Sequence, residues 1–95
     1  MVRYILLEHN CGYIFGDLVE SSPVSAAVSL DKSLTNDESE YFYEETGRYD
    51  ASARYYVYYA SNDFPTIEDG QDQELIEAVI RDCPYIATVS RYLIA

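Results

Sequence analysis

Two runs of residues carry the strongest strand pattern in the chain. Residues 2–8 are apolar at odd and even positions alike, which is typical of a strand buried on both faces. Residues 54–60 are rich in tyrosine and valine and indicate a second strand. The tight-turn sequence Asn-Cys-Gly at 10–12 predicts that residues 2–16 form an antiparallel hairpin, which the Gly-Asp pair at 16–17 ends.

Two other segments have the spacing of amphipathic helices. A Ser-Pro start and a narrow apolar stripe predict a helix over residues 23–34. A broader apolar face predicts a second helix over residues 72–83, with acidic residues in its first half and Pro84 as its stop. Glu77 and Arg81 lie four positions apart in this helix and are predicted to pair.

The remaining strand patterns complete the expected fold. Residues 41–43 and 85–94 are predicted strands, so the order is β-β-α-β-β-α-β. This order predicts an α+β class: a mainly antiparallel sheet of four to five strands with two helices on one face. The length of 95 residues predicts a single domain spanning residues 1–95.

Charge is the unusual property of the composition. The chain has 17 Asp and Glu residues against 6 Lys and Arg residues, a formal net charge of −11. This balance argues against direct binding to nucleic acid through phosphates, which needs clustered cations, and against docking on an anionic membrane. No apolar run is long enough to span a bilayer, and we expect a cytoplasmic protein.

The residues able to perform metal or thiol chemistry are few. Cys11 and Cys83 are expected to be reduced and structural, and one histidine with two distant cysteines does not give a zinc spacing. The acidic stretch at 68–74 lacks the calcium-loop pattern. We therefore expect no metal, no cofactor and no enzyme. A small enzyme using His9 and Cys11 is the alternative, and it predicts a reactive Cys11 thiol near neutral pH.

The chain contains eleven tyrosines, many of them close to acidic residues. In the second strand, alternation sends Tyr56 and Tyr58 to one face and Tyr55, Val57 and Tyr59 to the other. One set is expected to fill the core under the helices and the other to lie on the open face of the sheet. Exposed tyrosines surrounded by carboxylates are typical of a protein-binding patch, whereas buried ones only pack the sheet.

The spacing of the carboxylates suggests what such a patch would bind. Glu38 and Glu40 on an extended segment lie about 6.6 Å apart, and duplex DNA carries a phosphate every ~3.4 Å of axis per strand, further apart along the backbone. Asp72, Glu74 and Glu77 on the second helix have similar separations. Rows of carboxylates at these separations fit the positively charged nucleic-acid groove of a partner protein.

In size, charge and aromatic content the whole chain resembles the small acidic phage-encoded inhibitors that mimic DNA, the anti-restriction and anti-CRISPR proteins. The resemblance rests on composition rather than on a motif. It implies a non-enzymatic inhibitor that binds a basic Cas or restriction protein at its nucleic-acid-binding surface, in the cytoplasm of a bacterial host. The candidate contact residues are Asp37, Glu38, Glu40, Glu44, Glu45, Asp69, Asp72, Glu74 and Glu77, with Tyr41, Tyr43, Tyr56 and Tyr58 as anchors.

The tyrosines alone support a second interpretation. A structural or assembly module would associate with itself through the aromatic face of the sheet, and this association would be insensitive to salt. The sequence leaves the oligomeric state open between these two readings.

Overall fold

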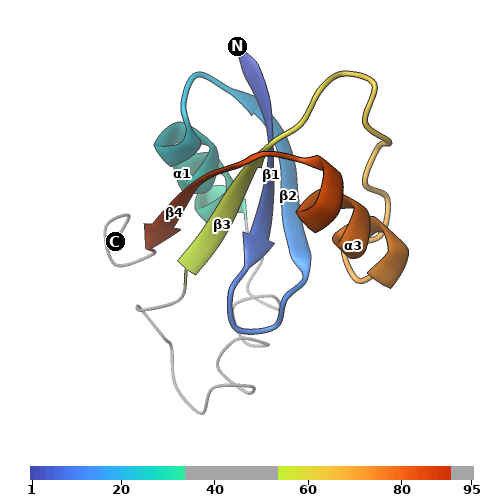
Figure 1. Ribbon diagram of the computed structural model, residues 1–95. Coiled ribbons are helices and arrows are strands. Elements are labelled where there is room, and N and C mark those ends of the chain that lie inside the picture. The colour runs from blue at the N-terminus through green and yellow to red at the C-terminus, as the bar shows by residue number, and fades with distance from the viewer. Residues whose placement is uncertain (34–53, 91–95) are drawn as a thin grey trace.

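The computed structural model describes residues 1–33 and 54–90. Its strands form one sheet in the order β2-β1-β3-β4, and each neighbouring pair is antiparallel. Within these residues, the α+β class, the antiparallel sheet and two helices are therefore confirmed (Figure 1). The elements in chain order are β1 (Val2–Glu8), β2 (Ile14–Glu20), α1 (Pro23–Ser33), β3 (Arg54–Tyr59), α3 (Gln73–Asp82) and β4 (Tyr85–Ser90).

Strand β1 lies at the centre of the sheet and is buried on both sides, as its apolar pattern predicts. Tyr4 and Leu6 belong to one buried cluster, which contains residues of α1. Ile5 and Leu7 belong to a second buried cluster, which contains residues of α3. Successive residues of a strand point to opposite faces, so the two clusters lie on opposite faces of the sheet.

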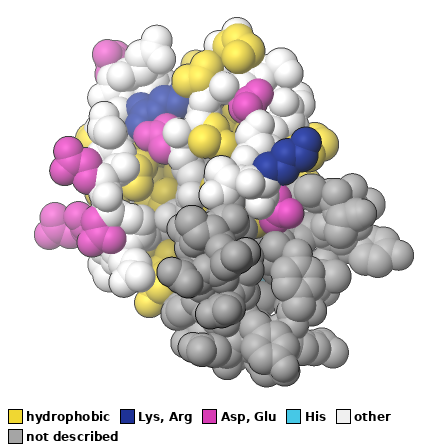
Figure 2. All heavy atoms as spheres, turned by 180° about the vertical axis from the view of Figure 1, so that it is seen from behind, with side chains coloured by type: hydrophobic (Ala, Val, Ile, Leu, Met, Phe, Trp, Pro, Cys, Tyr) yellow, Lys and Arg dark blue, Asp and Glu magenta, His cyan; other side chains and the backbone are white. Residues whose placement is uncertain are grey.

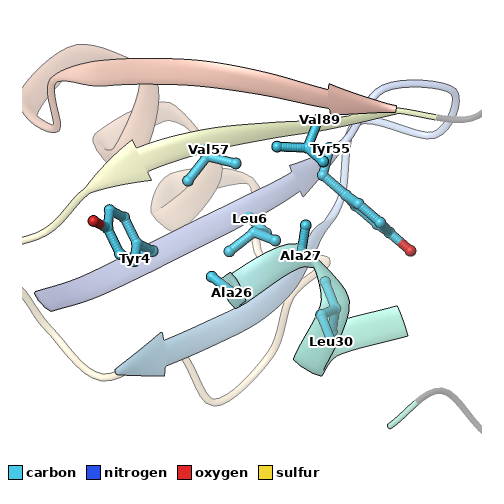
Figure 3. Packing of buried hydrophobic residues seen from close by; sticks show 8 residues of the cluster. All are labelled: Tyr4, Leu6, Ala26, Ala27, Leu30, Tyr55, Val57 and Val89. Atoms are coloured by element: carbon cyan, nitrogen blue, oxygen red, sulfur yellow. The ribbon is translucent and has the colours of Figure 1, made fainter. Parts of the chain in front are cut away.

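The placement of the helices thus differs from the expectation that both lie on one face. Figure 3 shows Ala26, Ala27 and Leu30 of α1 packed against Leu6 and neighbouring side chains of the sheet. Helix α3 covers the other face through Ile76 and Val79. The physical reason is the apolar character of β1 on both faces, because two helices on one face would leave half of that surface in water.

Strand β2 is longer than the sequence pattern predicts. The Gly-Asp pair at 16–17 was expected to end the hairpin, but the strand continues to Glu20, and Gly16 pairs with Leu6. A Cβ atom at Gly16 would lie 3.2 Å from the side chain of Leu30. Gly16 therefore allows the close approach of α1 to the sheet and is not a strand stop.

The helices begin and end within a residue of the predicted bounds. Helix α3 is capped by Asp72, and Cys83 is its C-terminal cap residue. The predicted ion pair within α3 is wrong, because Arg81 instead holds its neighbour Asp82 at 2.9 Å. The expected strand at 41–43 and the last residues of the expected strand 85–94 lie outside the described residues.

The long connection between β3 and α3 is held to the sheet at two places. The Arg3 guanidinium donates to the carbonyl oxygens of Ser61, Phe64 and Pro65, at 2.9, 2.6 and 2.8 Å. Further along, the Ile14 N–H donates to the carbonyl oxygen of Gly70 at 2.9 Å. These contacts fix the position from which α3 starts.

Candidate protein-binding surface

The acidic candidates divide into two groups. Asp69, Asp72, Glu74 and Glu77 lie in the described part of the chain, around the start of α3. The others lie outside the described residues: Asp37, Glu38, Glu40, Glu44 and Glu45, with the candidate anchors Tyr41 and Tyr43.

The four described candidates form one exposed acidic turn, named here the α3 acidic turn. The Asp69 carboxylate accepts a hydrogen bond from the Gln71 N–H at 3.0 Å. The Asp72 carboxylate accepts from the N–H groups of Glu74 and Leu75, at 3.0 and 3.4 Å. These backbone contacts hold two of the carboxylates in place and satisfy donors of the first helical turn.

No Lys or Arg among the described residues forms an ion pair with the α3 acidic turn. Glu77 does lie near enough to Arg81 to contribute, after Asp82, to raising the pKa of that guanidinium. The electrostatic potential of the turn is therefore largely uncompensated within the described part of the chain, which favours a cationic partner.

Most of the other described carboxylates each have a hydrogen-bond or ion-pair partner of their own. Asp17 forms a bidentate pair with Arg3, with both N···O distances at 2.7 Å. Glu20 accepts hydrogen bonds from the hydroxyl groups of Ser25 and Ser29. Figure 2 shows the molecule from behind, with its carboxylates spread across this face and some of them next to cations. Among the described residues, Asp69, Asp72, Glu74 and Glu77 are exposed around the start of α3.

Tyr56 and Tyr58 do not lie on an open face, since α3 packs on their side of the sheet. Both are half-buried beside the cluster under α3. The Tyr58 ring meets the Tyr85 ring edge to face, with 5.9 Å between the ring centroids. The Tyr56 ring meets the His9 ring in the same way at 5.7 Å, and its hydroxyl lies 3.3 Å from His9 Nδ1.

His9 with Tyr56 and Tyr58 with Tyr85 are thus two edge-to-face pairs, and Tyr56 and Tyr58 lie on the same face of β3. These four residues are named here the aromatic row. Burial raises the pKa of the Tyr58 hydroxyl, as does the proximity of Tyr85. Tyr85 is 57% exposed and marks the accessible end of the row. Sequence reasoning missed His9 and Tyr85 as members of this surface, because pairing between β3 and β4 is a tertiary property.

The other tyrosine face of β3 is only partly the core that alternation predicts. Tyr55 and Val57 are fully buried, and the Tyr55 hydroxyl donates to the Asp31 carboxylate at 3.0 Å. Tyr59 shares their face but is 42% exposed at the end of the strand. Tyr55 therefore packs the sheet, whereas Tyr59 contributes to the surface.

The geometry around Cys11 does not supply the thiolate that the enzyme alternative needs. Burial, and then the neighbouring Glu8 side chain, raise the pKa of the Cys11 thiol to about 12. The thiol is therefore protonated at neutral pH. The His9 ring contacts the side chain of Tyr56.

Alkylation of Cys11 by iodoacetamide near neutral pH should be at least about a hundredfold slower in the folded chain than in urea, because the thiolate is scarce. The Glu8→Gln variant should react faster, since it removes a negative charge that raises the Cys11 pKa. Peptide mass spectrometry assigns the modified cysteine. Equal rates in folded and unfolded protein would show that the thiol is not protected.

Glu8 is the one charged residue in the described core. It is fully buried, and its Oε2 atom accepts from the N–H groups of Asn10 and Cys11, at 2.8 and 2.9 Å. Gly12 follows with φ +71°, a conformation that glycine adopts without strain. The Glu8 carboxylate therefore holds the turn that follows His9, the member of the aromatic row at the end of β1.

A shallow pocket of about 170 Å³ lies between β2 and the 67–70 segment, and its ionisable side chain, Asp17, is already paired with Arg3. In the described ranges, no three His, Cys, Asp or Glu side chains gather as a metal site would require. No helix in these ranges is long and apolar enough to cross a membrane.

The comparisons with known proteins give no family for the chain: no family model, no curated protein and no solved structure matches it.

Proposed function

We propose that this chain is a non-enzymatic binding protein for a basic protein partner. The contact surface is the α3 acidic turn, with the tyrosines of the aromatic row as neighbouring anchors. The observation that carries the proposal is the turn itself: four exposed carboxylates, two of them fixed by backbone hydrogen bonds, with no ion pair from a described cation.

The physical argument is electrostatic complementarity. A chain with a net charge of −11 attracts a basic surface over a Debye length of about 8 Å at physiological salt. Carboxylates that are already held in place lose little freedom on binding, which favours a fast and salt-sensitive association. Tyrosines add buried area at a low cost in rotamer entropy.

More specifically, we propose that the partner is a nucleic-acid-binding protein of a bacterial host cell, such as a Cas or restriction component. The carboxylates then occupy the groove that otherwise receives phosphates. This form draws support from the charge, the size and the aromatic content shared with DNA-mimic inhibitors. It places the chain in the cytoplasm of the host.

The test is capture of a partner from bacterial host lysate by the immobilised chain, at low and at high salt. The wild-type chain should retain a basic protein at low salt and release it at high salt. The Glu74→Lys/Glu77→Lys variant should lose at least about tenfold in affinity for that protein, because it replaces attraction by repulsion at the α3 acidic turn.

The Asp63→Lys variant is the control, since Asp63 is exposed on a loop outside the acidic turn. Its effect on the affinity for the captured protein, per reversed charge, should be much smaller than that of Glu74→Lys/Glu77→Lys. Reversal of Glu38, Glu40 and Glu44 tests the second acidic segment in the same assay. Unchanged affinity after both sets of charge reversals would show that these acidic residues do not form the contact surface, and it would contradict the proposed function.

A further inference from the structure

Helix α3 exposes an apolar side chain beside the carboxylates of the α3 acidic turn. Ile80 lies in the last turns of the helix and is 56% exposed, whereas Ile76 and Val79 are buried against the sheet. Residues three positions apart lie on the same side of a helix, so Ile80 is a neighbour of Glu77 on the exposed side. This side of α3 is therefore acidic at its start and apolar near its end.

Tyr85 is a second exposed side chain at the same end of the helix. It follows α3 after Cys83 and Pro84 and is 57% exposed. Its ring contacts the ring of Tyr58, which packs beside the cluster under α3. Tyr85 pairs with Tyr58 across the two strands, and directly paired residues share a face of the sheet. Tyr85 thus lies on the face that α3 covers, beyond the end of the helix.

The dimensions of a helix set the spacing between the two parts of this side. At a rise of about 1.5 Å per residue, Ile80 lies about 4.5 Å from Glu77 and about 9 Å from Glu74 along the helix axis. The charged residues that follow Ile80 are Arg81 and Asp82, which pair with each other at 2.9 Å. The end of α3 is therefore locally neutral, whereas its start has an uncompensated negative charge.

The two parts would contribute differently to binding. Exposed carboxylates attract a basic surface and orient it, but salt screens their effect. Stable interfaces also bury apolar or aromatic anchors inside a polar rim. Single exposed apolar side chains are common on protein surfaces. Ile80 differs from such a side chain in its position, because any basic surface that contacts Glu74 and Glu77 is brought within reach of it.

We propose that the partner contacts α3 along its length, with cations on the acidic turn and apolar groups on Ile80 and Tyr85. This inference rests on the proposed function and adds a property of the partner: its surface is amphipathic, with apolar side chains about 9 Å or less from its cations. A groove built only for phosphates would leave Ile80 and Tyr85 in water. The salt-resistant part of the affinity then comes from these two residues.

The test uses two synthetic helical peptides with the same lysines. One carries leucines six positions from the lysines, which is the separation of Ile80 from Glu74, and the other carries glutamines there. Calorimetry measures the dissociation constant of each peptide for the full chain, at low and at physiological salt. The wild-type chain should bind the leucine peptide at least about fivefold more tightly, because that peptide buries apolar surface.

Ile80→Gln should remove most of this preference and should leave the affinity for the glutamine peptide within about twofold, because the charge is unchanged. Glu74→Lys/Glu77→Lys should weaken both peptides by similar factors. Val24→Gln is the matched control, since Val24 is 58% exposed on α1, the helix on the other face of the sheet. This control variant should keep the full preference.

Circular dichroism checks that each variant is folded, and Tyr85→Ser tests the same anchor if Ile80→Gln is not. Equal affinity of the wild-type chain for the two peptides would overturn this inference and leave the proposed function standing. A preference for leucine that survives in the anchor variant would do the same. If neither peptide binds even at low salt, the proposed function itself is contradicted, and the inference falls with it.

Discussion

Gly70→Ala is expected to be among the most destabilising single substitutions in the described chain, at about 3 kcal/mol or more. A Cβ atom at this position would overlap the carbonyl oxygen of Ile14, which belongs to the backbone and cannot rotate away. The β2 strand and the 70–72 segment must then separate, and the Ile14 N–H loses its partner. Urea denaturation monitored by circular dichroism measures the change.

Gly12→Ala is the matched control for this glycine. Gly12 has φ +71°, but no atom lies within 4 Å of a Cβ placed there. Its substitution therefore costs only the left-handed backbone conformation, about 1–2 kcal/mol. If Gly70→Ala were no more destabilising than Gly12→Ala, the close contact between the connection and β2 would be absent in solution.

Arg3→Met is expected to lower the free energy of unfolding by about 3 kcal/mol. The Arg3 and Asp17 side chains are only 12% and 20% exposed, so the substitution leaves a largely buried carboxylate without its cation. It also removes the donor to three carbonyl oxygens of the connection before α3. The Arg3 guanidinium further lies 5.8 Å from the centre of the Phe64 ring.

Arg54→Met is the control for the loss of an arginine at the surface, because Arg54 is exposed. Its free energy of unfolding should stay within about 0.5 kcal/mol of the wild-type value. Arg3→Lys should recover only part of the loss, since a single ammonium group cannot reproduce the forked contacts of the guanidinium. Full stability of Arg3→Lys would show that charge alone, and not the fork, holds the connection.

Some of this fold follows from local patterns. The two-sided apolar run of β1 predicts a central strand, and the broad apolar face of residues 72–83, with Pro84 as its stop, predicts α3. The same two-sided run also requires a cover on each face, and the expectation of two helices on one face overlooked that consequence. Local spacing indicates an element and its buried side, but not which neighbour covers it.

Other features depend on contacts between distant residues. The Gly-Asp pair at 16–17 is typical of the end of a strand. Gly16 nevertheless lies inside β2, where the absence of a side chain leaves room for Leu30 of α1. Arg81 has two acidic neighbours within reach in the sequence, and the structure shows that it pairs with Asp82. The aromatic row likewise depends on the register between β3 and β4. Neither strand order nor register is encoded in the spacing of one segment.

For the proposed contact surface, the sequence shows which residues are acidic, but not how their carboxylates lie relative to one another. Asp72 is the N-terminal cap residue of α3, and Glu74 and Glu77 lie in its first half, as the helix predicted over residues 72–83 implies. The prediction for the segment containing Glu38 and Glu40 lies outside the described residues. The α3 acidic turn is therefore the part of the proposed contact surface on which variants can be designed from geometry.

The most direct test of the central claim is competition between this chain and duplex DNA for the captured partner. If carboxylates of this chain stand in for phosphates, added duplex DNA should release the bound protein in proportion to its concentration. The Glu74→Lys/Glu77→Lys variant should release the protein at lower DNA concentrations than the wild type, because its affinity for the shared site is lower. A partner that remains fully bound to the wild-type chain in saturating DNA, at low and at high salt, would contradict the account.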